Sequence, residues 1–328
     1  MPGRGCFAKF ALAILSCLSV HWATPAVAQC SRNHNSAGKA GEPVIIDSDI
    51  GDDIDDAFAL ALALRSPEFR VLGVSVDFGN TPMRARLADR FLKATGCSNI
   101  PVAMGEETTQ PIRMTQMNYA LAEKESVHPD ATDFILKAIR ENPGQVTLIA
   151  IGPLVNVGSL IDKDPETFRK LKRVVMMGGS IERRSGDLSY LPATGPMPEY
   201  NIRRDIPDAQ KLFASGVPIY MMPLDSTQIK LDEVKREILF KMGTSFTDQL
   251  TLLYHQWGQI TPTLYDAMAV AYAIKPELCP VEPMHIVVDQ KGYTRRETGP
   301  PNAHVCLHSN SDAFFSFFMP RFSVVGER

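Results

Sequence analysis

The 328-residue sequence lacks a large excess of charge of either sign. Its 34 basic residues nearly balance its 37 acidic residues, and the formal net charge is −3. Proteins that bind nucleic acid or anionic membranes through general electrostatic attraction carry a basic excess. The composition gives no support to that class, and we expect no nucleic-acid partner.

The chain also lacks internal repeats, low-complexity tracts and any linker-like change of composition after its first 42 residues. Its length suits one large α/β domain or two small ones. Since nothing divides the rest of the chain, we predict a single catalytic domain over residues 43–328.

A long hydrophobic run is missing as well, because the most apolar stretch, Phe10–Val20, is too short to cross a bilayer comfortably. Arg4 and Lys9 give it a positive start, and the small-residue sequence Ala-Val-Ala follows at 26–28. This order is typical of a cleaved secretory signal.

We therefore predict a signal peptide at 1–28, a flexible lead-in at 29–42 and an exported protein, periplasmic or secreted, without a stable membrane anchor. An uncleaved anchor is the alternative. A lipid anchor on Cys30 is disfavoured because Gln29 is larger than such a site normally allows.

Cysteine is scarce in the predicted mature chain, which keeps Cys30, Cys97, Cys279 and Cys306. No CxxC pair or Cys/His cluster indicates zinc. An oxidising compartment allows one or two disulfides, and the three possible pairings stay open.

Short apolar runs alternate with helical patterns along most of the chain. The pattern predicts strands at 43–47, 69–78, 145–153, 171–180 and 217–223, and helices at 56–66, 83–96, 130–144, 206–216 and 265–274. Such alternation favours an α/β fold with a mainly parallel sheet covered by helices on both faces, a Rossmann-like core. The first and last of these helices are apolar nearly all round, so we expect them to be buried.

Unusual polar residues follow these strands, where ligands bind in open α/β sheets. Six aspartates crowd into Asp47–Asp56 after the first strand, and Asn80 follows the second. Several carboxylates at close range repel one another, and burial makes each more costly. A hard divalent cation with oxygen ligands resolves the conflict. A solvated acidic turn with one capping Asp is the alternative.

Two familiar patterns fit this cluster less well. In an EF-hand loop the glycine would come one place after Gly51. A haloacid-dehalogenase-type phosphatase would use Asp47 as nucleophile and Asp49 as acid/base, but Gly51 stands where such enzymes have Thr or Val. The phosphatase remains an alternative.

The stretch "DSDIGDDIDDA" at 47–57 resembles the D-x-D-x-G-x-D-D-A signature of the inosine–uridine-preferring nucleoside hydrolase family. Five further segments resemble that family in the same order, so the resemblance covers roughly residues 43–320. They are "FGN" (78–80), "IGPLVNV" (151–157), "VVMMGGS" (174–180), "PEYNIRRDIPDA" (198–209) and "YDAMAVAY" (265–272).

The resemblance implies a nucleoside-hydrolase-like α/β fold and a Ca²⁺-dependent enzyme, a homo-oligomer (dimer or tetramer), that hydrolyses ribonucleosides to ribose and free base. It implies calcium ligands at Asp49, Asp56 and Asp266, together with the backbone carbonyl of Ile151. It also implies substrate-binding roles for Asp55, Asn80, Met177, Glu199 and Asn201.

The chemistry agrees with these roles. Breaking the C1′–N bond builds an oxocarbenium-like cation that carboxylates can stabilise. A bound dication makes water more acidic, and we expect Asp49 to be the catalytic base that takes the proton. Asp49 should start ionised beside such a cation.

The sequence departs from the family pattern in two places. Asp52 and Asp53 are additional, so either could enter the metal shell. Tyr265 stands where some members that cleave pyrimidine nucleosides have His. An aromatic residue there can stack on the base, which favours purine nucleosides. A structural tyrosine is the alternative, and loss of the imidazole also allows a non-catalytic ribosyl-binding relative.

Three other side chains have open roles. Trp257 could form a wall over the base or simply pack. Arg203 and Arg204 follow the sugar-binding segment and could contact an anionic substrate such as a nucleotide, or be solvated.

Overall fold

The computed structural model describes Met1 and residues 41–109, 113–187 and 191–323. The predicted signal peptide (apart from Met1) and most of the predicted lead-in lie outside these ranges, so both stay predictions. The first strand already begins at Glu42, which therefore belongs to the folded domain and not to the lead-in.

A nine-stranded sheet forms the centre of the molecule, in the order β3-β2-β1-β4-β5-β6-β9-β7-β8. All neighbours from β3 to β9 are parallel, while β7 runs antiparallel to β9 and to β8. This confirms the mainly parallel, mixed sheet. The strands are β1 Glu42–Ser48, β2 Phe69–Val76, β3 Val102–Met104, β4 Thr147–Ala150, β5 Arg173–Met177, β6 Ile219–Met222, β7 Glu282–Val288, β8 Thr294–Glu297 and β9 Ala303–Val305.

Helices connect the strands and account for most of the remaining chain. They are α1 Asp55–Leu64, α2 Thr81–Ala94, α3 Met117–Leu121, α4 Ala131–Glu141, α5 Val155–Lys163, α6 Pro165–Phe168, α7 Tyr200–Arg204, α8 Ile206–Ala214, α9 Leu224–Thr227, α10 Glu233–Phe240, α11 Ser245–Trp257, α12 Tyr265–Ile274 and α13 Ser311–Phe318, with short 3₁₀ turns at Pro276–Leu278 and Met319–Phe322.

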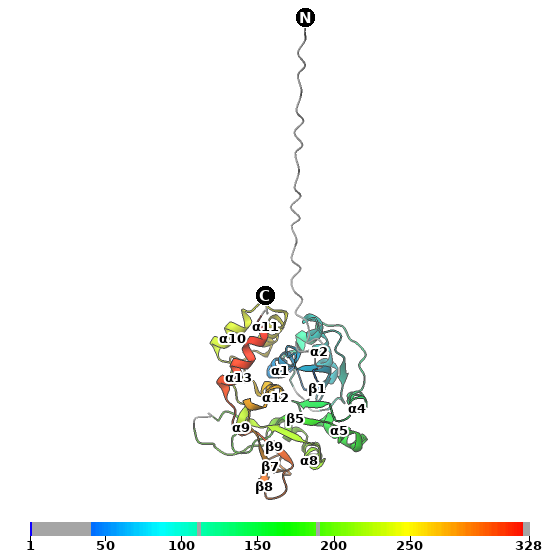
Figure 1. Cartoon of the computed structure of the whole chain (residues 1–328), viewed down its shortest axis with the longest axis vertical. Coiled ribbons are helices and arrows are strands. Elements are labelled where there is room, and N and C mark those ends of the chain that lie inside the picture. Colours follow the sequence, from blue (N-terminus) through cyan, green and yellow to red (C-terminus); the bar gives the residue numbers. More distant parts are fainter. Residues whose placement is uncertain (2–40, 110–112, 188–190, 324–328) are drawn as a thin grey trace.

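Helices cover both faces of the sheet, as predicted. Val44 and Ile46 of β1 join a core with α1, α2, α11, α12 and α13, whereas Ile45 joins a second core with α4, α5 and α8. This alternation follows from the two-residue period of a strand. Figure 1 shows α1, α12 and α13 on one side of the row from β1 to β5, and α4, α5 and α8 on the other.

Helices α1 and α12 are the apolar helices that the sequence predicted to be buried. All ten residues of α1 are buried, and α12 packs against it. Because both helices start at the same edge of the sheet, the acidic residues of their first turns come together there. Asp266 thereby reaches Asp55, which is 211 positions earlier in the chain.

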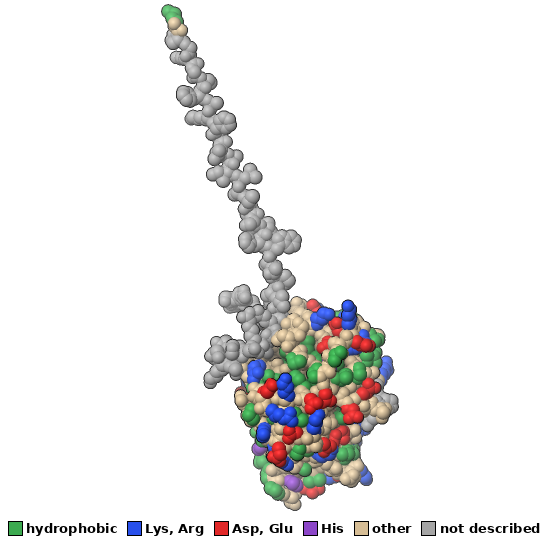
Figure 2. All heavy atoms as spheres, turned by 90° about the vertical axis from the view of Figure 1, so that its right-hand side faces the viewer, with side chains coloured by type: hydrophobic (Ala, Val, Ile, Leu, Met, Phe, Trp, Pro, Cys, Tyr) green, Lys and Arg blue, Asp and Glu red, His purple; other side chains and the backbone are tan. Residues whose placement is uncertain are grey.

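The surface carries both signs of charge. Figure 2 shows Lys and Arg side chains interspersed with Asp and Glu on the face it presents, in line with a net charge of −3. That face offers no broad basic area for a polyanion.

One disulfide bond joins Cys279 to Cys306 and closes a segment of 27 residues. It links the end of the α12 region to the residue after β9 and supplies one of the predicted bridges; Cys30 lies outside the described residues. Among the helices in the described ranges, none is long and apolar enough to cross a membrane.

Candidate active site

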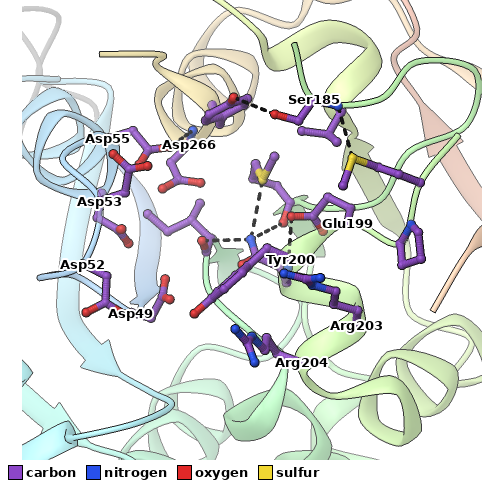
Figure 3. Close-up of a pocket in the computed structure, with 18 of the residues that line it drawn as sticks. Asp49, Asp52, Asp53, Asp55, Ser185, Glu199, Tyr200, Arg203, Arg204 and Asp266 are labelled. Atoms are coloured by element: carbon purple, nitrogen blue, oxygen red, sulfur yellow. Dashed lines mark hydrogen bonds between the residues drawn. The ribbon is translucent and has the colours of Figure 1, made fainter. Parts of the chain in front are cut away.

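A cavity of about 540 Å³ opens at the carboxyl ends of the parallel strands. Its lining is strongly acidic, and Figure 3 shows most of these carboxylates gathered along one side. The acidic lining residues are Asp49, Asp52, Asp53, Asp55, Asp56, Glu199 and Asp266.

Three buried carboxylates form the tightest group in this cavity. One carboxylate oxygen from each of Asp55, Asp56 and Asp266 lies within 4.8 Å of the others. The Ser48 hydroxyl donates to Asp56 at 2.6 Å, and the Asp266 backbone N–H donates to Asp55 at 3.4 Å. We call these three residues the carboxylate cluster.

The carboxylate cluster suits a divalent cation. Burial is the largest cause that raises the pKa of each of these carboxyls well above its usual value, and repulsion from neighbouring aspartates adds to it. A hard cation with oxygen ligands offsets both effects. The described residues contain no other group of three acidic, His or Cys side chains with this spacing.

Asp49 lies in the loop after β1, is 7% exposed and lines the same cavity. It does not belong to the carboxylate cluster, whose third member is Asp55, for which the sequence predicted a ribose contact. From the protein's groups alone, burial raises the pKa of Asp49 to about 7, although the positive charge of Arg84 opposes this shift. A dication nearby would lower that pKa again and favour the carboxylate.

Ile151 and Met177 both line the cavity from the ends of neighbouring strands. The Ile151 carbonyl accepts a hydrogen bond from the Asn201 amide at 3.2 Å, and the Met177 carbonyl accepts from the same amide at 3.1 Å. The side chain of Asn201 therefore holds β4 and β5 at a fixed separation at the cavity floor.

Glu199 is held just as firmly. Its carboxylate accepts from the backbone N–H groups of Gly179, Asn201 and Ile202 at 2.9, 3.0 and 3.2 Å, and it caps the N-terminus of α7. Glu199 and Asn201 thus line the cavity in fixed positions, as a sugar-binding wall requires.

Asn80 is the predicted site residue that does not reach the cavity. It is exposed, and its side chain accepts from the Met83 N–H at 3.1 Å to cap α2. The expectation that Asn80 contacts ribose gains no support from this placement, because the helix cap occupies its side-chain oxygen.

Tyr265 and Trp257 form an aromatic part of the lining. The Tyr265 hydroxyl lies 3.4 Å from the hydroxyl of Ser185, and burial is the main cause that raises its pKa. Trp257, at the end of α11, is 7% exposed. No histidine of the described chain lines the cavity, so a leaving-group acid of that type is not part of this wall.

The wall contributed by α7 is basic. Arg203 and Arg204 line the cavity, and the Arg204 guanidinium stacks 4.8 Å from the centre of the Tyr200 ring. Figure 3 shows both guanidinium groups on the α7 side, opposite Ser185 and away from Asp55. Arg113 also lines the cavity.

Arg84 is a functional residue that the sequence analysis missed. It is 2% exposed, pairs with Asp52 at 2.8 Å and donates to the carbonyls of Ile50 at 3.0 Å and of Asp49. This guanidinium fixes the backbone of the aspartate loop. Only the structure shows that Arg84 lies on the buried face of α2, together with Leu87, Ala88 and Phe91.

Asp77 was missed as well. It follows β2, is 1% exposed, and neither carboxylate oxygen has a hydrogen-bond partner among the described residues. A Cβ on Gly152 would come within 2.7 Å of Asp77 and 2.8 Å of the Asp49 nitrogen, so Gly152 is needed for this close approach. Burial and the charges of Asp47 and Asp49 raise the pKa of Asp77 well above its usual value.

The phosphatase hypothesis fails on the position of its nucleophile. Asp47 is 1% exposed, does not line the cavity, and accepts hydrogen bonds from Ser75 at 2.6 Å and Asn156 at 2.8 Å. This carboxylate lies beneath the site and supports its floor.

Known proteins resemble the chain over nearly all of the folded domain. The profile of the inosine-uridine preferring nucleoside hydrolase family matches residues 44–316. The pyrimidine-specific ribonucleoside hydrolase RihA of Citrobacter koseri is 31% identical over 323 residues, which span 85% of this chain and 97% of RihA. The uncharacterized protein C1683.06c of Schizosaccharomyces pombe is 36% identical over 208 residues, 59% of this chain and 64% of that protein.

A solved structure supports the fold independently. The plant nucleoside hydrolase PpNRh1 superposes with a TM-score of 0.76 at 23% identity, over 86% of this chain and 99% of that one.

The fold and the acidic cavity define a metal-dependent hydrolase of N-glycosyl compounds. The chain belongs to the inosine–uridine preferring nucleoside hydrolase family.

Proposed function

We propose that the protein is a Ca²⁺-dependent ribonucleoside hydrolase that is exported from the cell. The observation that carries the proposal is the carboxylate cluster of Asp55, Asp56 and Asp266, which lines the same cavity as Asp49. The chain's membership of the nucleoside hydrolase family agrees with it. Three acidic ligands and the carbonyl of Ile151 suit the large oxygen shell of Ca²⁺, which leaves places for sugar hydroxyls.

The residues of the chain divide the reaction between them. Bound Ca²⁺ would acidify and hold the attacking water. Asp49 accepts a proton from that water as its oxygen bonds to C1′. The C1′–N bond breaks, and its electron pair leaves with the base, which gains a proton. Glu199 and the other carboxylates of the wall stabilise the positive charge that develops on the sugar.

The preferred base is part of the proposal. Tyr265 in the aromatic lining supports stacking on a purine, whereas the RihA relatives are named as pyrimidine-specific. We propose the purine preference on the side chain present here. A kcat/KM for uridine or cytidine that equals or exceeds the value for inosine would overturn it.

The test of the function is a panel of nucleosides with the Ca²⁺-loaded mature protein. Free base is measured by chromatography, and reducing sugar is measured in parallel. We expect base release from ribonucleosides, slower release from 2′-deoxynucleosides, and loss of activity in excess EDTA. Tight ribose binding without hydrolysis, unchanged in Asp49→Asn, would favour the non-catalytic alternative.

Export and self-association complete the proposal. The Cys279–Cys306 disulfide supports an oxidising compartment. When the full chain is expressed in a bacterial host, the exported protein should begin at Gln29 by N-terminal sequencing. Light scattering should give the mass of a dimer or tetramer; a monomer would overturn the predicted homo-oligomer.

A further inference from the structure

The basic wall of the cavity has no task in the hydrolysis of a neutral nucleoside. Arg203 lines the cavity from α7 and makes no ion pair with a carboxylate of the described chain. Arg204 lines the cavity beside it and stacks on Tyr200 at 4.8 Å. Two adjacent guanidinium groups at a substrate cavity are suited to a phosphoryl group, which they can bind through paired N–H donors.

Neutralising the aspartates of the cavity accounts for Arg204 in part, since burial raises the pKa of Asp52 and the charge of Arg204 opposes this rise, but no carboxylate of the described chain forms an ion pair with Arg203. Arg84 already pairs with Asp52 at 2.8 Å and fixes the aspartate loop from below. The carboxylate cluster itself is suited to a cation. The aspartate loop therefore has its own positive partner in Arg84, and the charge of Arg203 on the α7 wall is available to a group bound in the cavity.

The geometry of a ribosyl group explains why the charge lies on this wall. A ribose held by its 2′ and 3′ hydroxyls at the carboxylate cluster extends its two substituents, the base on C1′ and the 5′ oxygen on C4′, in different directions. Ser185, which contacts Tyr265 at the proposed base wall, lies opposite Arg203 and Arg204 (Figure 3). A base at Tyr265 thus leaves the 5′ oxygen directed at α7.

Tyr200 connects the floor to the arginines. Its hydroxyl lies near enough to Asp49 and Asp52 for their charges, after burial, to help raise its pKa to about 12. Its ring carries Arg204 on one face. Tyr200, which lines the cavity, therefore lies close both to the aspartate loop and to the Arg204 guanidinium.

We propose that the cavity accepts ribonucleoside 5′-monophosphates, with the phosphoryl group bound by Arg203 and Arg204. This inference rests on the proposed hydrolase function. Water attacks C1′, the C1′–N bond breaks, the base leaves with the bonding electrons and a proton, and the other product is ribose 5-phosphate. The phosphate ester itself stays intact.

The test compares uridine and inosine with their 5′- and 3′-monophosphates. The 3′-monophosphate carries the same charge but would place it against the carboxylate cluster. We expect the wild type to cleave the 5′-monophosphates with a kcat/KM at least equal to that of the nucleosides, and the 3′-monophosphates far more slowly. In the double variant R203Q/R204Q, the ratio of kcat/KM for 5′-monophosphate over nucleoside should fall at least about tenfold.

Arg295→Gln is the matched control. Arg295 lies on β8, forms an ion pair with Asp289 and is not part of the cavity lining. Arg295→Gln should leave the ratio unchanged. Nucleoside cleavage with 5′-monophosphates that are neither cleaved nor competitive inhibitors overturns this inference alone. An unchanged ratio in the double variant, or equal cleavage of 3′-monophosphates, overturns it as well.

Failure of the proposed function gives a different result. If no compound releases base, the hydrolase proposal fails, and calorimetric titration of uridine 5′-monophosphate still tests the arginines. If uridine 5′-monophosphate binds the wild type but not R203Q/R204Q, the phosphoryl-binding role of the two arginines is supported. Equal affinity for the wild type and the double variant would overturn the site. Circular dichroism of each variant excludes misfolding as the cause.

Discussion

At the scale of single residues, Asp49 stands apart from the other aspartates of the cavity. It is beside the carboxylate cluster but not in it, and it is the carboxylate whose backbone Arg84 fixes. A base must keep a lone pair directed at water, whereas the cluster residues direct their oxygens at one another. This difference in surroundings is the reason to give Asp49 the proton-accepting role.

Replacing Asp49 by Asn tests that role. The amide keeps the size of the side chain but accepts no proton, so kcat should fall by roughly 10²–10⁴-fold. The fold should persist by circular dichroism and thermal midpoint. Asp312→Asn, on the exposed surface of α13, is the control and should keep full activity. Asp49→Asn with a wild-type rate would remove Asp49 from the mechanism.

Tyr265 decides the base in our proposal. Tyr265→His removes part of the stacking surface and adds a group that exchanges protons near neutral pH. We expect the ratio of kcat/KM for inosine over uridine to fall by about tenfold. Tyr265→Phe keeps the ring and should keep the ratio within about threefold. A ratio that Tyr265→His leaves unmoved would make Tyr265 a structural residue.

The sequence predicted acidic site residues better than their neighbours. The crowding of aspartates at 47–56 predicted a cation, because burying several carboxylates together is costly, whereas Asp266 was implied only by the resemblance to the family. Arg84 was not predictable, because an arginine in a helix is normally solvated and only the fold reveals that its face is buried. Asn80 was predicted in the cavity, but a residue that follows a strand can equally cap the next helix, and here it does.

At the scale of elements, the hydrophobic pattern predicted the strands β1, β2, β4, β5 and β6 and the helices α1, α2, α4, α8 and α12. It did not predict β3 and β9, which have three residues each. It did not predict β8 either, because the sequence Thr-Arg-Arg-Glu carries three exposed charged residues. Strands this short or this polar, of which β3 and β8 are the edges of the sheet, are held by pairing with their neighbours. A periodic pattern within one segment carries no information about such pairing.

The cap of α8 makes stability depend on pH. Asp205 accepts from the Asp208 N–H at 3.3 Å, and burial together with Asp208 raises the pKa of Asp205 to about 7. Between the ordinary carboxyl value and pH 7, the folded state holds a proton that the unfolded chain has released. The free energy of unfolding therefore falls as pH rises through that window and is constant above it.

Asp205→Asn keeps the cap and removes the titration. We compare the free energy of unfolding of the variant with that of the wild type at pH 4 and at pH 8.5. The difference should favour the variant by about 1 kcal/mol more at pH 8.5 than at pH 4, a value reduced for solvent screening at a half-exposed group. Denaturant unfolding at both pH values measures it. An equal difference between variant and wild type at both pH values would contradict the assignment.

At the scale of the whole molecule, the Cys279–Cys306 bond ties the mixed edge of the sheet to the α12 region. It closes 27 residues, so removing it should cost about 3–4 kcal/mol of stability in the chain-entropy view. For a domain of this size, Cys279→Ala/Cys306→Ala should lower the thermal midpoint by roughly 10 °C. An unchanged midpoint would mean that packing alone holds this edge. Because neither sulfur lines the cavity, nucleoside affinity should persist below the new midpoint.

The proposed cation site lies between the buried helices α1 and α12, so we expect calcium binding to stabilise the whole fold. The first turns of α1 and α12 place Asp55, Asp56 and Asp266 together, and their repulsion opposes the packing of these helices. A cation that binds only the folded state stabilises it by about 2.7 kcal/mol at one hundred times its dissociation constant. Thermal unfolding in Ca²⁺ and in EDTA should therefore differ by several degrees, with a smaller effect of Mg²⁺, which prefers a stricter octahedral shell.

Asp266→Asn separates cation binding from charge repulsion in the same experiment. The amide removes one negative charge from the carboxylate cluster, so in EDTA this variant should be at least as stable as the wild type. In Ca²⁺ it should gain little, because one charged ligand is gone. A midpoint that rises with Ca²⁺ as much as in the wild type would place the cation elsewhere. A variant less stable than the wild type in EDTA would show that Asp266 stabilises the helix pair without a cation.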